Sequence, residues 1–142
     1  MKLRAIFRAF LLVACAGLVA ACSMPPIPGQ AELPDDAKVT HRAVFIGKEL
    51  HDTQGTISLY QSQAYPVIVF EPNFKFQGST DAVVALGRNG YEANTSLGDL
   101  LRNSGRQAYA VPEHLPIRKF NEVWLWNRRE GIPLGIARLV PI

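Results

Sequence analysis

Short apolar runs separated by polar turn residues occupy the chain from residue 42 to its end. The run TISLYQS at 56–62 alternates, with Ile57 and Leu59 on one face, which is typical of a half-buried β-strand. The run YPVIVFE at 65–71 is almost continuously apolar, as expected for a buried strand. Further strands are expected at 42–47, 81–87, 107–112, 121–127 and 132–140. About seven to eight short strands at this spacing predict an all-β, antiparallel sandwich or barrel.

The segments between these runs carry turn-forming residues, and only one of them suggests a helix. DTQG, GRNG, NSG and NRREG are rich in the residues that form tight turns, and the Asn-Gly pair in GRNG is typical of a hairpin. In 96–105, SLGDLLRNSG, Ser96 could cap a helix of barely two turns and Gly105 would end it. Such a helix would point three leucines inward: Leu97, Leu100 and Leu101. We therefore expect one short helix at 96–105.

The first 21 residues have the organisation of a secretory signal peptide. A basic start precedes an apolar run at 9–21, which is too short for a membrane span of about 20 apolar residues. The run ends in Val-Ala-Ala-Cys, and this resembles the bacterial lipobox, in which the cysteine thiol receives a diacylglycerol before cleavage and acylation of the new amine. A second match ends at Cys15 but leaves only about half the usual apolar length. We therefore expect Cys22 to be lipidated; the alternative is a plain signal peptide with an incidental cysteine.

The residues that follow the leader predict a tether. Four prolines within 22–38, CSMPPIPGQAELPDDAK, favour an extended, semi-rigid segment. Ser23 rather than aspartate follows Cys22, which resembles lipoproteins sorted to the outer membrane. We expect a signal peptide at 1–21, a Pro-rich tether at 22–40 and one domain at 41–142, anchored in the lipid bilayer through acylated Cys22 and facing the periplasm.

Charge and cysteine content exclude several functions. The chain has 15 basic and 12 acidic residues, and three of the basic ones lie in the leader, so the predicted mature chain is formally neutral. A neutral chain without a basic run gives no electrostatic footprint for nucleic acid. Arg128-Arg129 is followed by Glu130 and is interpreted as a solvated loop. Both cysteines precede the folded part, so no thiol remains there for redox chemistry or thiolate–metal binding.

The order of several motifs resembles a known family. AVFIGKELHDTQGTISLY is followed by GSTDAVVALG, SLGDLLRNSGRQAYAVP and NEVWLWNRREGIPLGIARL. The most specific part is Leu-Gly-Asp-Leu at 97–100, followed by Gly-x-Gln-x-Tyr-x-x-Pro at 105–112. This succession, over about 42–139, resembles the DM13 domain, a β-sandwich found beside DOMON domains and proposed to transfer electrons. The resemblance implies a single β-sandwich with an electron-transfer function.

The resemblance also implies a redox cysteine in the penultimate strand, after an aromatic residue and eight positions before a glycine of the last strand. In this chain those positions are Asn127, after Trp126 and before Gly135. An amide offers no redox couple and is a poor ligand for a soft metal. This difference does not affect the fold that the resemblance implies. Electron transfer through the cysteine, however, has no residue to carry it in this chain.

Four residues are candidates for ligand binding: Asn127, Trp126, Tyr109 and His51. Trp124 and Trp126 share one face of a strand. We interpret the pair first as core, because tryptophan is usually buried. An exposed pair would instead be a candidate binding hot spot. Tyr109 could lie near it. His51, beside Asp52 in a loop, could in principle bind a metal, but the histidine spacing is not that of a metal site, and a backbone hydrogen bond that holds the hairpin is expected instead.

These observations predict a non-enzymatic binding or interaction module of the cell envelope, without a cofactor. No Gly-x-Ser-x-Gly or His-Glu-x-x-His motif is present, and a small hydrolase would need a clustered Ser/His/Asp set. The expected partner is another envelope protein or a small ligand. The alternative function is a redox accessory that transfers electrons with a bound cofactor.

Overall fold

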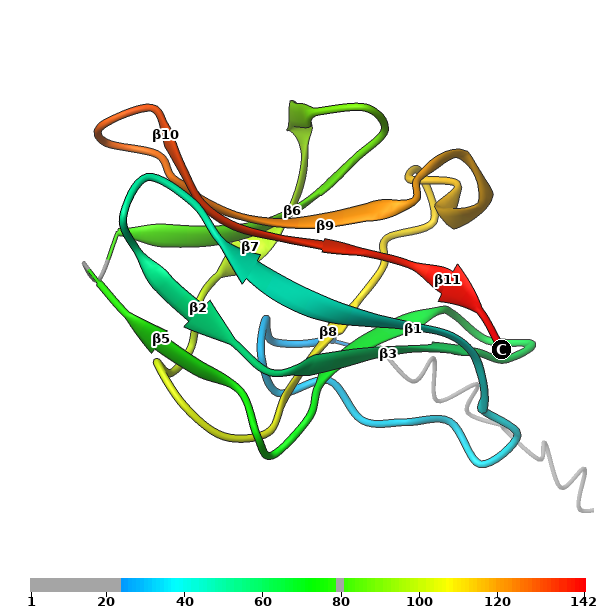
Figure 1. The fold of residues 1–142 in the computed structure, drawn as a ribbon. Helices are drawn as coiled ribbons and strands as arrows, with labels where there is room; N and C mark the ends of the chain where they lie inside the picture. The colour runs from blue at the N-terminus through cyan, green and yellow to red at the C-terminus, as the bar shows by residue number, and fades with distance from the viewer. Residues whose placement is uncertain (1–23, 79–80) are drawn as a thin grey trace, which may run out of the picture.

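The computed structural model describes residues 24–78 and 81–142 and shows an almost entirely β architecture (Figure 1). The strands are β1 (Lys38–Gly47), β2 (Asp52–Gln54), β3 (Thr56–Gln61), β4 (Val67–Phe70), β5 (Lys75–Gln77), β6 (Ala82–Gly87), β7 (Tyr91–Asp99), β8 (Gln107–Ala110), β9 (Glu122–Asn127), β10 (Ile132–Arg138) and β11 (Val140–Pro141). The helical turn η1 (Ile117–Lys119) is the one helical element in the described part of the chain.

One antiparallel sheet with the order β7-β6-β9-β10-β1-β3-β4-β8 wraps around a single core. β1 joins its two halves, because it pairs with β3 on one side and with both β11 and β10 on the other. The two halves therefore face each other as the layers of a sandwich do, and the second, two-stranded sheet β2-β5 lies beside them (Figure 1). The predicted all-β, antiparallel class is confirmed.

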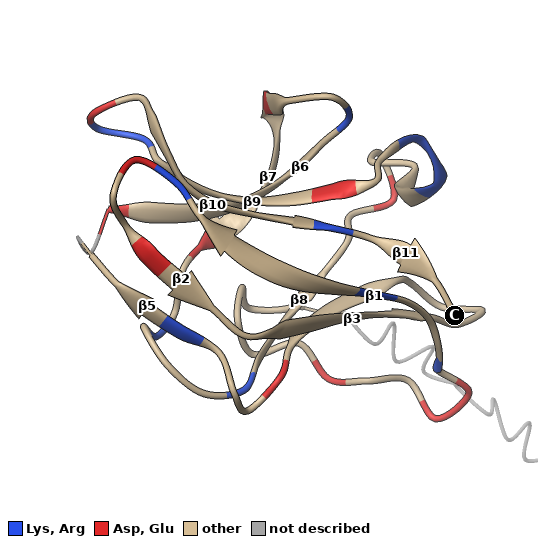
Figure 2. Cartoon of the chain, in the orientation of Figure 1, with Lys and Arg blue, Asp and Glu red and all other residues tan. Residues whose placement is uncertain are grey.

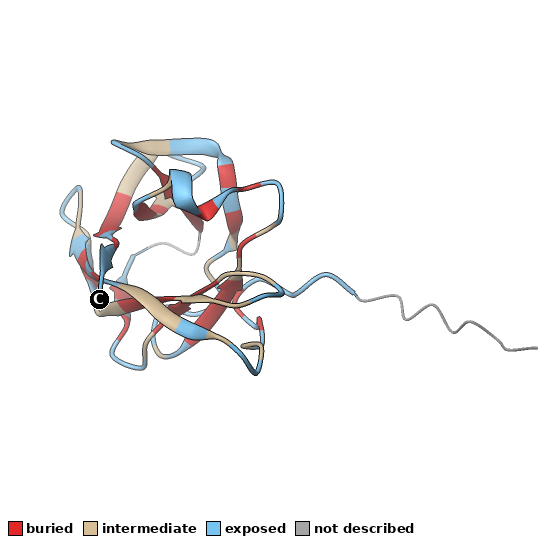
Figure 3. Ribbon diagram, turned by 90° about the vertical axis from the view of Figure 1, so that its right-hand side faces the viewer, coloured by how far each residue is buried: buried red, intermediate tan, exposed pale blue. Residues whose placement is uncertain are grey.

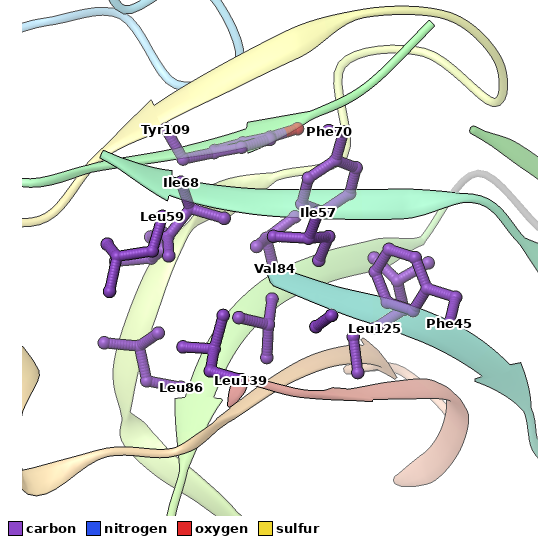
Figure 4. Packing of buried hydrophobic residues seen from close by; sticks show 14 of the residues in the cluster. Phe45, Ile57, Leu59, Ile68, Phe70, Val84, Leu86, Tyr109, Leu125 and Leu139 are labelled. Carbon is purple, nitrogen blue, oxygen red and sulfur yellow. The ribbon is translucent and has the colours of Figure 1, made fainter. Parts of the chain in front are cut away.

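Aromatic side chains fill the centre of this core (Figure 4). Phe45 of β1 lies against Phe70 of β4 and Phe74, with ring centroids 5.3 and 5.5 Å apart, and Phe70 also contacts Tyr109 of β8 at 5.3 Å. Ile57 and Leu59 point into the core, as the alternation in β3 predicts. Phe45 and Phe70 thus pack edge-on, and the other two ring pairs are tilted, which are arrangements that stabilise aromatic clusters.

The outer faces of β4 and β8 are covered by residues 28–33, which we call the N-terminal strap. The amide of Ala31 donates to the Ala108 carbonyl and the amide of Ala108 donates to the Gly29 carbonyl, both at 3.1 Å. Ala31 packs with Val67 and Val69 in a small outer cluster. This cover explains why the run around β4 is apolar on both faces. The proline pattern of the predicted tether did not indicate this contact.

The strap also bridges the seam between β7 and β8, the two ends of the large sheet. Pro28 lies on Gly98 of β7 so closely that a Cβ at residue 98 would be 2.3 Å from the Pro28 Cβ. Gly98 has φ +128°, a conformation that L side chains rarely adopt. Both observations require glycine at this position.

The predicted helix at 96–105 is wrong. Ser96 pairs with Ala85 in the β6–β7 ladder, and Leu97 points into the core as a strand residue. The amide of Leu100 donates to the Ala82 carbonyl at 2.9 Å, and that of Leu101 donates to Oε1 of Gln107 at 3.1 Å. Bonds to neighbouring strands therefore replace the helical pattern, and Leu101 is exposed.

The predicted signal peptide at 1–21 and Cys22 lie outside the described residues. Within 24–78 and 81–142, no helix is long and apolar enough to cross a membrane.

Removal of the strap is expected to destabilise the domain. A chain that begins at Leu33 loses the two backbone hydrogen bonds to Ala108 and the buried Ala31, which should lower the free energy of unfolding by about 2 kcal/mol, because each such bond contributes roughly 1 kcal/mol. Urea unfolding followed by circular dichroism measures the change. A chain that begins at Ile27 is the matched control and should unfold within about 0.5 kcal/mol of the full domain; equal stability of the two truncations would contradict the role of the strap.

Candidate functional site

An aromatic surface occupies the outer side of β9. Val123 and Leu125 point into the core and are fully buried, whereas Trp124 and Trp126 lie on the opposite side and are half-buried. The interpretation of the two tryptophans as core residues is therefore wrong, because the inner face of β9 is already filled. The pair leaves indole surface accessible on the outside of the domain.

Tyr91 covers part of this surface. Its ring is stacked on Trp126, with centroids 4.0 Å apart and planes within 5° of parallel. The β6–β7 hairpin brings Tyr91 there, because Asn89 and Gly90 both have positive φ, as the Asn-Gly pair predicts, and the chain turns back over the sheet. The buried hydroxyl of Thr95 donates to the Leu86 carbonyl and holds this bend. We call Tyr91, Trp124 and Trp126 the aromatic face.

A buried carboxylate fixes Trp124. Oε2 of Glu122 accepts hydrogen bonds from Nε1 of Trp124 at 3.0 Å and from the amide of Gly90 at 2.9 Å. The guanidinium of Arg138 lies 3.6 Å from the other oxygen. Glu122 is only 4 % exposed, so these partners compensate for the burial of its charge. The sequence pattern does not single out Glu122 or Tyr91, because their roles depend on the β6–β7 turn lying over β9.

Charged residues follow β9 directly, in the turn between β9 and β10 (Figure 2). Nη2 of Arg128 lies 2.6 Å from the carboxylate of Asp99, and Arg129 lies 3.9 Å from Asp81. These four residues line a shallow cleft of about 230 Å³. The side chains are largely exposed, so the pairs contribute little to stability and their charges remain accessible to a partner. The interpretation of Arg128-Arg129-Glu130 as a solvated loop agrees with this exposure.

Asn127, the position that the resemblance assigns to the redox cysteine, forms the turn between β9 and β10. Its side chain is buried, and its Oδ1 accepts a hydrogen bond from the amide of Glu130 at 2.9 Å. Its carbonyl accepts a second bond, from the amide of Gly131 at 2.8 Å. Asn127 thus lies next to Trp126 in the strand but has a turn-forming role.

Tyr109 lies apart from the aromatic face, and the expectation that it could be near Trp126 is wrong. Its ring points inward from β8 and is completely buried (Figure 4). The hydroxyl is 2.7 Å from Oε1 of Gln107 and 3.2 Å from the Asp99 carbonyl, and it accepts a bond from the amide of Leu101 at 3.1 Å. Burial raises the pKa of Tyr109 to about 12. This residue anchors the segment after β7.

His51 lies in the turn between β1 and β2. Its amide donates to the Lys48 carbonyl at 2.9 Å, and its ring lies beside Phe76 of β5 with centroids 6.2 Å apart. In the described part of the chain, no group of three or more His, Cys, Asp or Glu side chains is placed to hold a metal ion. The structure therefore brings Trp126 and Asn127 together, while Tyr109 and His51 have separate environments.

The fold and this surface define a small antiparallel β domain with an aromatic, charge-bordered face. The profile of one family, "Electron transfer DM13", matches residues 44–139, and the chain belongs to this DM13 family. No curated protein and no solved structure matches the chain. Family membership confirms the resemblance seen in the sequence and associates the domain with electron transfer.

The matched region contains no cysteine, since the only two of the chain are Cys15 and Cys22. Haem and iron–sulfur groups are held by thiolate, imidazole, thioether or phenolate ligands. Around Asn127 the structure instead provides an amide used in a turn and two carboxylates, Asp81 and Asp99, that face arginines. These residues do not fit such a group, and we derive no electron-transfer step through them.

The buried hydroxyl of Tyr109 predicts a loss of stability at alkaline pH. The pKa is 10.0 for the ordinary side chain and about 12 in the folded domain, so the native state holds the proton more tightly than the unfolded chain. The stabilisation is complete below pH 10 and falls as the pH rises to about 12, by about 2–3 kcal/mol in total. Urea unfolding at a series of pH values measures this fall. Tyr109→Phe should remove this contribution at the cost of about 1–3 kcal/mol at neutral pH; an identical alkaline slope in both proteins would contradict it.

Proposed function

We propose that this DM13 domain is a binding module of the bacterial cell envelope, which docks an envelope protein through its aromatic face. The observation that carries the proposal is the half-exposed Tyr91–Trp126 stack, with the exposed Arg128 and Arg129 two and three residues after Trp126. Tryptophan, tyrosine and arginine are the residues that dominate binding energy in protein interfaces. The stack is held in place before binding, so little side-chain freedom would be lost on docking.

The rigid support of the aromatic face strengthens this argument. Glu122 fixes both Trp124 and the Gly90 turn that carries Tyr91. Gly87 allows the approach, because a Cβ at that residue would be 2.6 Å from Nε1 of Trp124. The buried carboxylate of Glu122 and the close packing at Gly87 both hold the aromatic face in place. Because the core does not need this surface, its rigid support favours a role in recognition.

The module is proposed to be anchored in the outer membrane through acylated Cys22 and to face the periplasm. The lipobox-like sequence and Ser23 support this placement. The strap shortens the free tether, since the chain contacts the domain from Pro28 onward. From Cys22 to Pro28 an extended chain spans about 20 Å. The domain would therefore work close to the bilayer surface, within reach of other membrane-bound proteins.

Electron transfer with a bound cofactor is the second candidate, and the family description favours it. The absence of a matching ligand set at Asn127 favours the binding module. The two candidates are distinguished by the absorption spectrum of the protein purified from its envelope.

Cys22→Ala is expected to release the protein from the membrane. Without a thiol at residue 22 no acyl chain can be attached, and each acyl CH₂ contributes about 0.8 kcal/mol to anchoring. Fractionation of cells should move the protein from the membrane pellet to the soluble fraction. Cys15→Ala is the matched control and should leave it in the pellet; continued sedimentation of the Cys22→Ala protein would contradict the anchor.

The aromatic face is tested by photo-crosslinking in cells. A photoreactive phenylalanine in place of Tyr91 should give a discrete adduct with an envelope protein, whereas the same residue in place of Tyr65, a half-buried tyrosine beside the strap, should not. Adding Trp126→Ala should reduce the adduct by about tenfold or more, because a central aromatic contact is removed.

Two results would contradict the binding module. One is equal labelling from positions 91 and 65, or none from either, in a protein whose thermal unfolding is unchanged. The other is a Soret band at one cofactor per chain in the purified protein, which would favour the electron-transfer function instead.

A further inference from the structure

A cavity of about 310 Å³ opens near the start of β9, away from Arg128 and Arg129, between η1 and strands β1, β3 and β11. Figure 3 looks at this end of the domain, with η1 crossing it and the C-terminus at its rim. The volume is at the lower end of the range found for small-molecule sites. Asn121, which precedes β9, lines this cavity, whereas Arg128, which follows β9, lines the cleft beside the aromatic face. The two features are therefore separate.

The floor of the cavity is apolar. Leu59 of β3, Ile117 of η1 and Leu139 are exposed by only 2, 8 and 8 %. Phe120, which is half-buried, packs against the same core. η1 has no side-chain cap, and the amides of Lys119 and Phe120 donate to the carbonyls of Pro116 and Ile117, within the same turn. The floor is thus a continuation of the core that remains partly open to solvent.

The rim of the cavity is polar and includes Arg118 and His41 but no acidic residue. Arg118 is exposed, and within the described residues its guanidinium has no ion pair or hydrogen bond. The Nδ1 atom of His41 is 2.9 Å from Oγ1 of Thr40, which leaves Nε2 for another partner. The side-chain amides of Gln61 and Asn121 complete the rim. An apolar floor with a few convergent polar groups is the usual composition of a ligand site.

We propose that this cavity binds a small amphipathic anion, with its apolar chain on Leu59, Phe120 and Leu139 and its carboxylate on Arg118. Charge complementarity selects the anion, because an arginine without a partner beside an uncharged, apolar floor attracts a carboxylate through charge-assisted hydrogen bonds. The volume selects a short ligand, such as a medium-chain carboxylate. This inference does not depend on the function of the aromatic face.

The test uses decanoate as the probe and the full mature chain with Cys22→Ala, so that no detergent competes. Nuclear magnetic resonance titration should shift the side-chain amides of Gln61 and Asn121, and leave the indole signals of Trp124 and Trp126 unchanged. Decanol, which has the same chain without the charge, should bind more weakly than decanoate.

Arg118→Ala should weaken decanoate binding by about tenfold, because a hydrogen bond to a charged group is lost. Arg129→Ala removes the same charge at the other end of β9 and should leave the affinity unchanged. Both arginines are exposed, so thermal unfolding should confirm that both variants fold.

Three results would overturn the proposal: no shift at Gln61 and Asn121, equal affinity of Arg118→Ala and the unchanged chain, or equal binding of decanol. Binding to anionic vesicles without binding of free decanoate would also overturn it, since the source of the anion would then be a membrane surface. None of these outcomes bears on the crosslinking test of the aromatic face.

Discussion

Strands that are apolar on both faces need cover on both faces, and this requirement organises the whole molecule. The core covers one side of β4 and of β9. The other side of β4 is covered by the strap, where Ala31 packs on Val67 and Val69. The other side of β9 is covered only in part, by Tyr91 on Trp126. The incomplete cover of β9 leaves the surface on which the proposed function rests.

Buried polar groups hold the segments that provide this cover. Glu122 binds the Gly90 turn and Trp124, and Tyr109 with Gln107 binds the segment after β7. In the described part of the chain, every fully buried side-chain nitrogen and oxygen has a hydrogen-bond partner. An unsatisfied buried polar group costs about 1–3 kcal/mol. The loops are therefore held in the positions in which these groups keep their hydrogen bonds.

The description of the DM13 family points to electron transfer, whereas the residues of this chain favour binding. The family is described by electron transfer, whereas the matched region has no cysteine and its Asn127 closes the β9–β10 turn. The same hairpin still presents arginines next to an aromatic stack. A domain that docks on a partner needs such a surface whether or not electrons pass, so the proposed docking function does not require a redox residue in this chain.

The alternation in β3 and the apolar runs of β4 and β9 determined the all-β class and most strands, because strand periodicity is local. The motif order indicated the family, because the motifs and their spacing can be read directly along the chain. The sequence did not reveal the strap, the long strand β7, the short strands β2, β5 and β11, or the role of Glu122. Their partners are distant in sequence: Gly29 pairs with Ala108, and Gly90 binds Glu122. At 96–105, bonds to neighbouring strands outweighed a weak helical pattern. Tertiary contacts decided these features, since only folding brings such groups together.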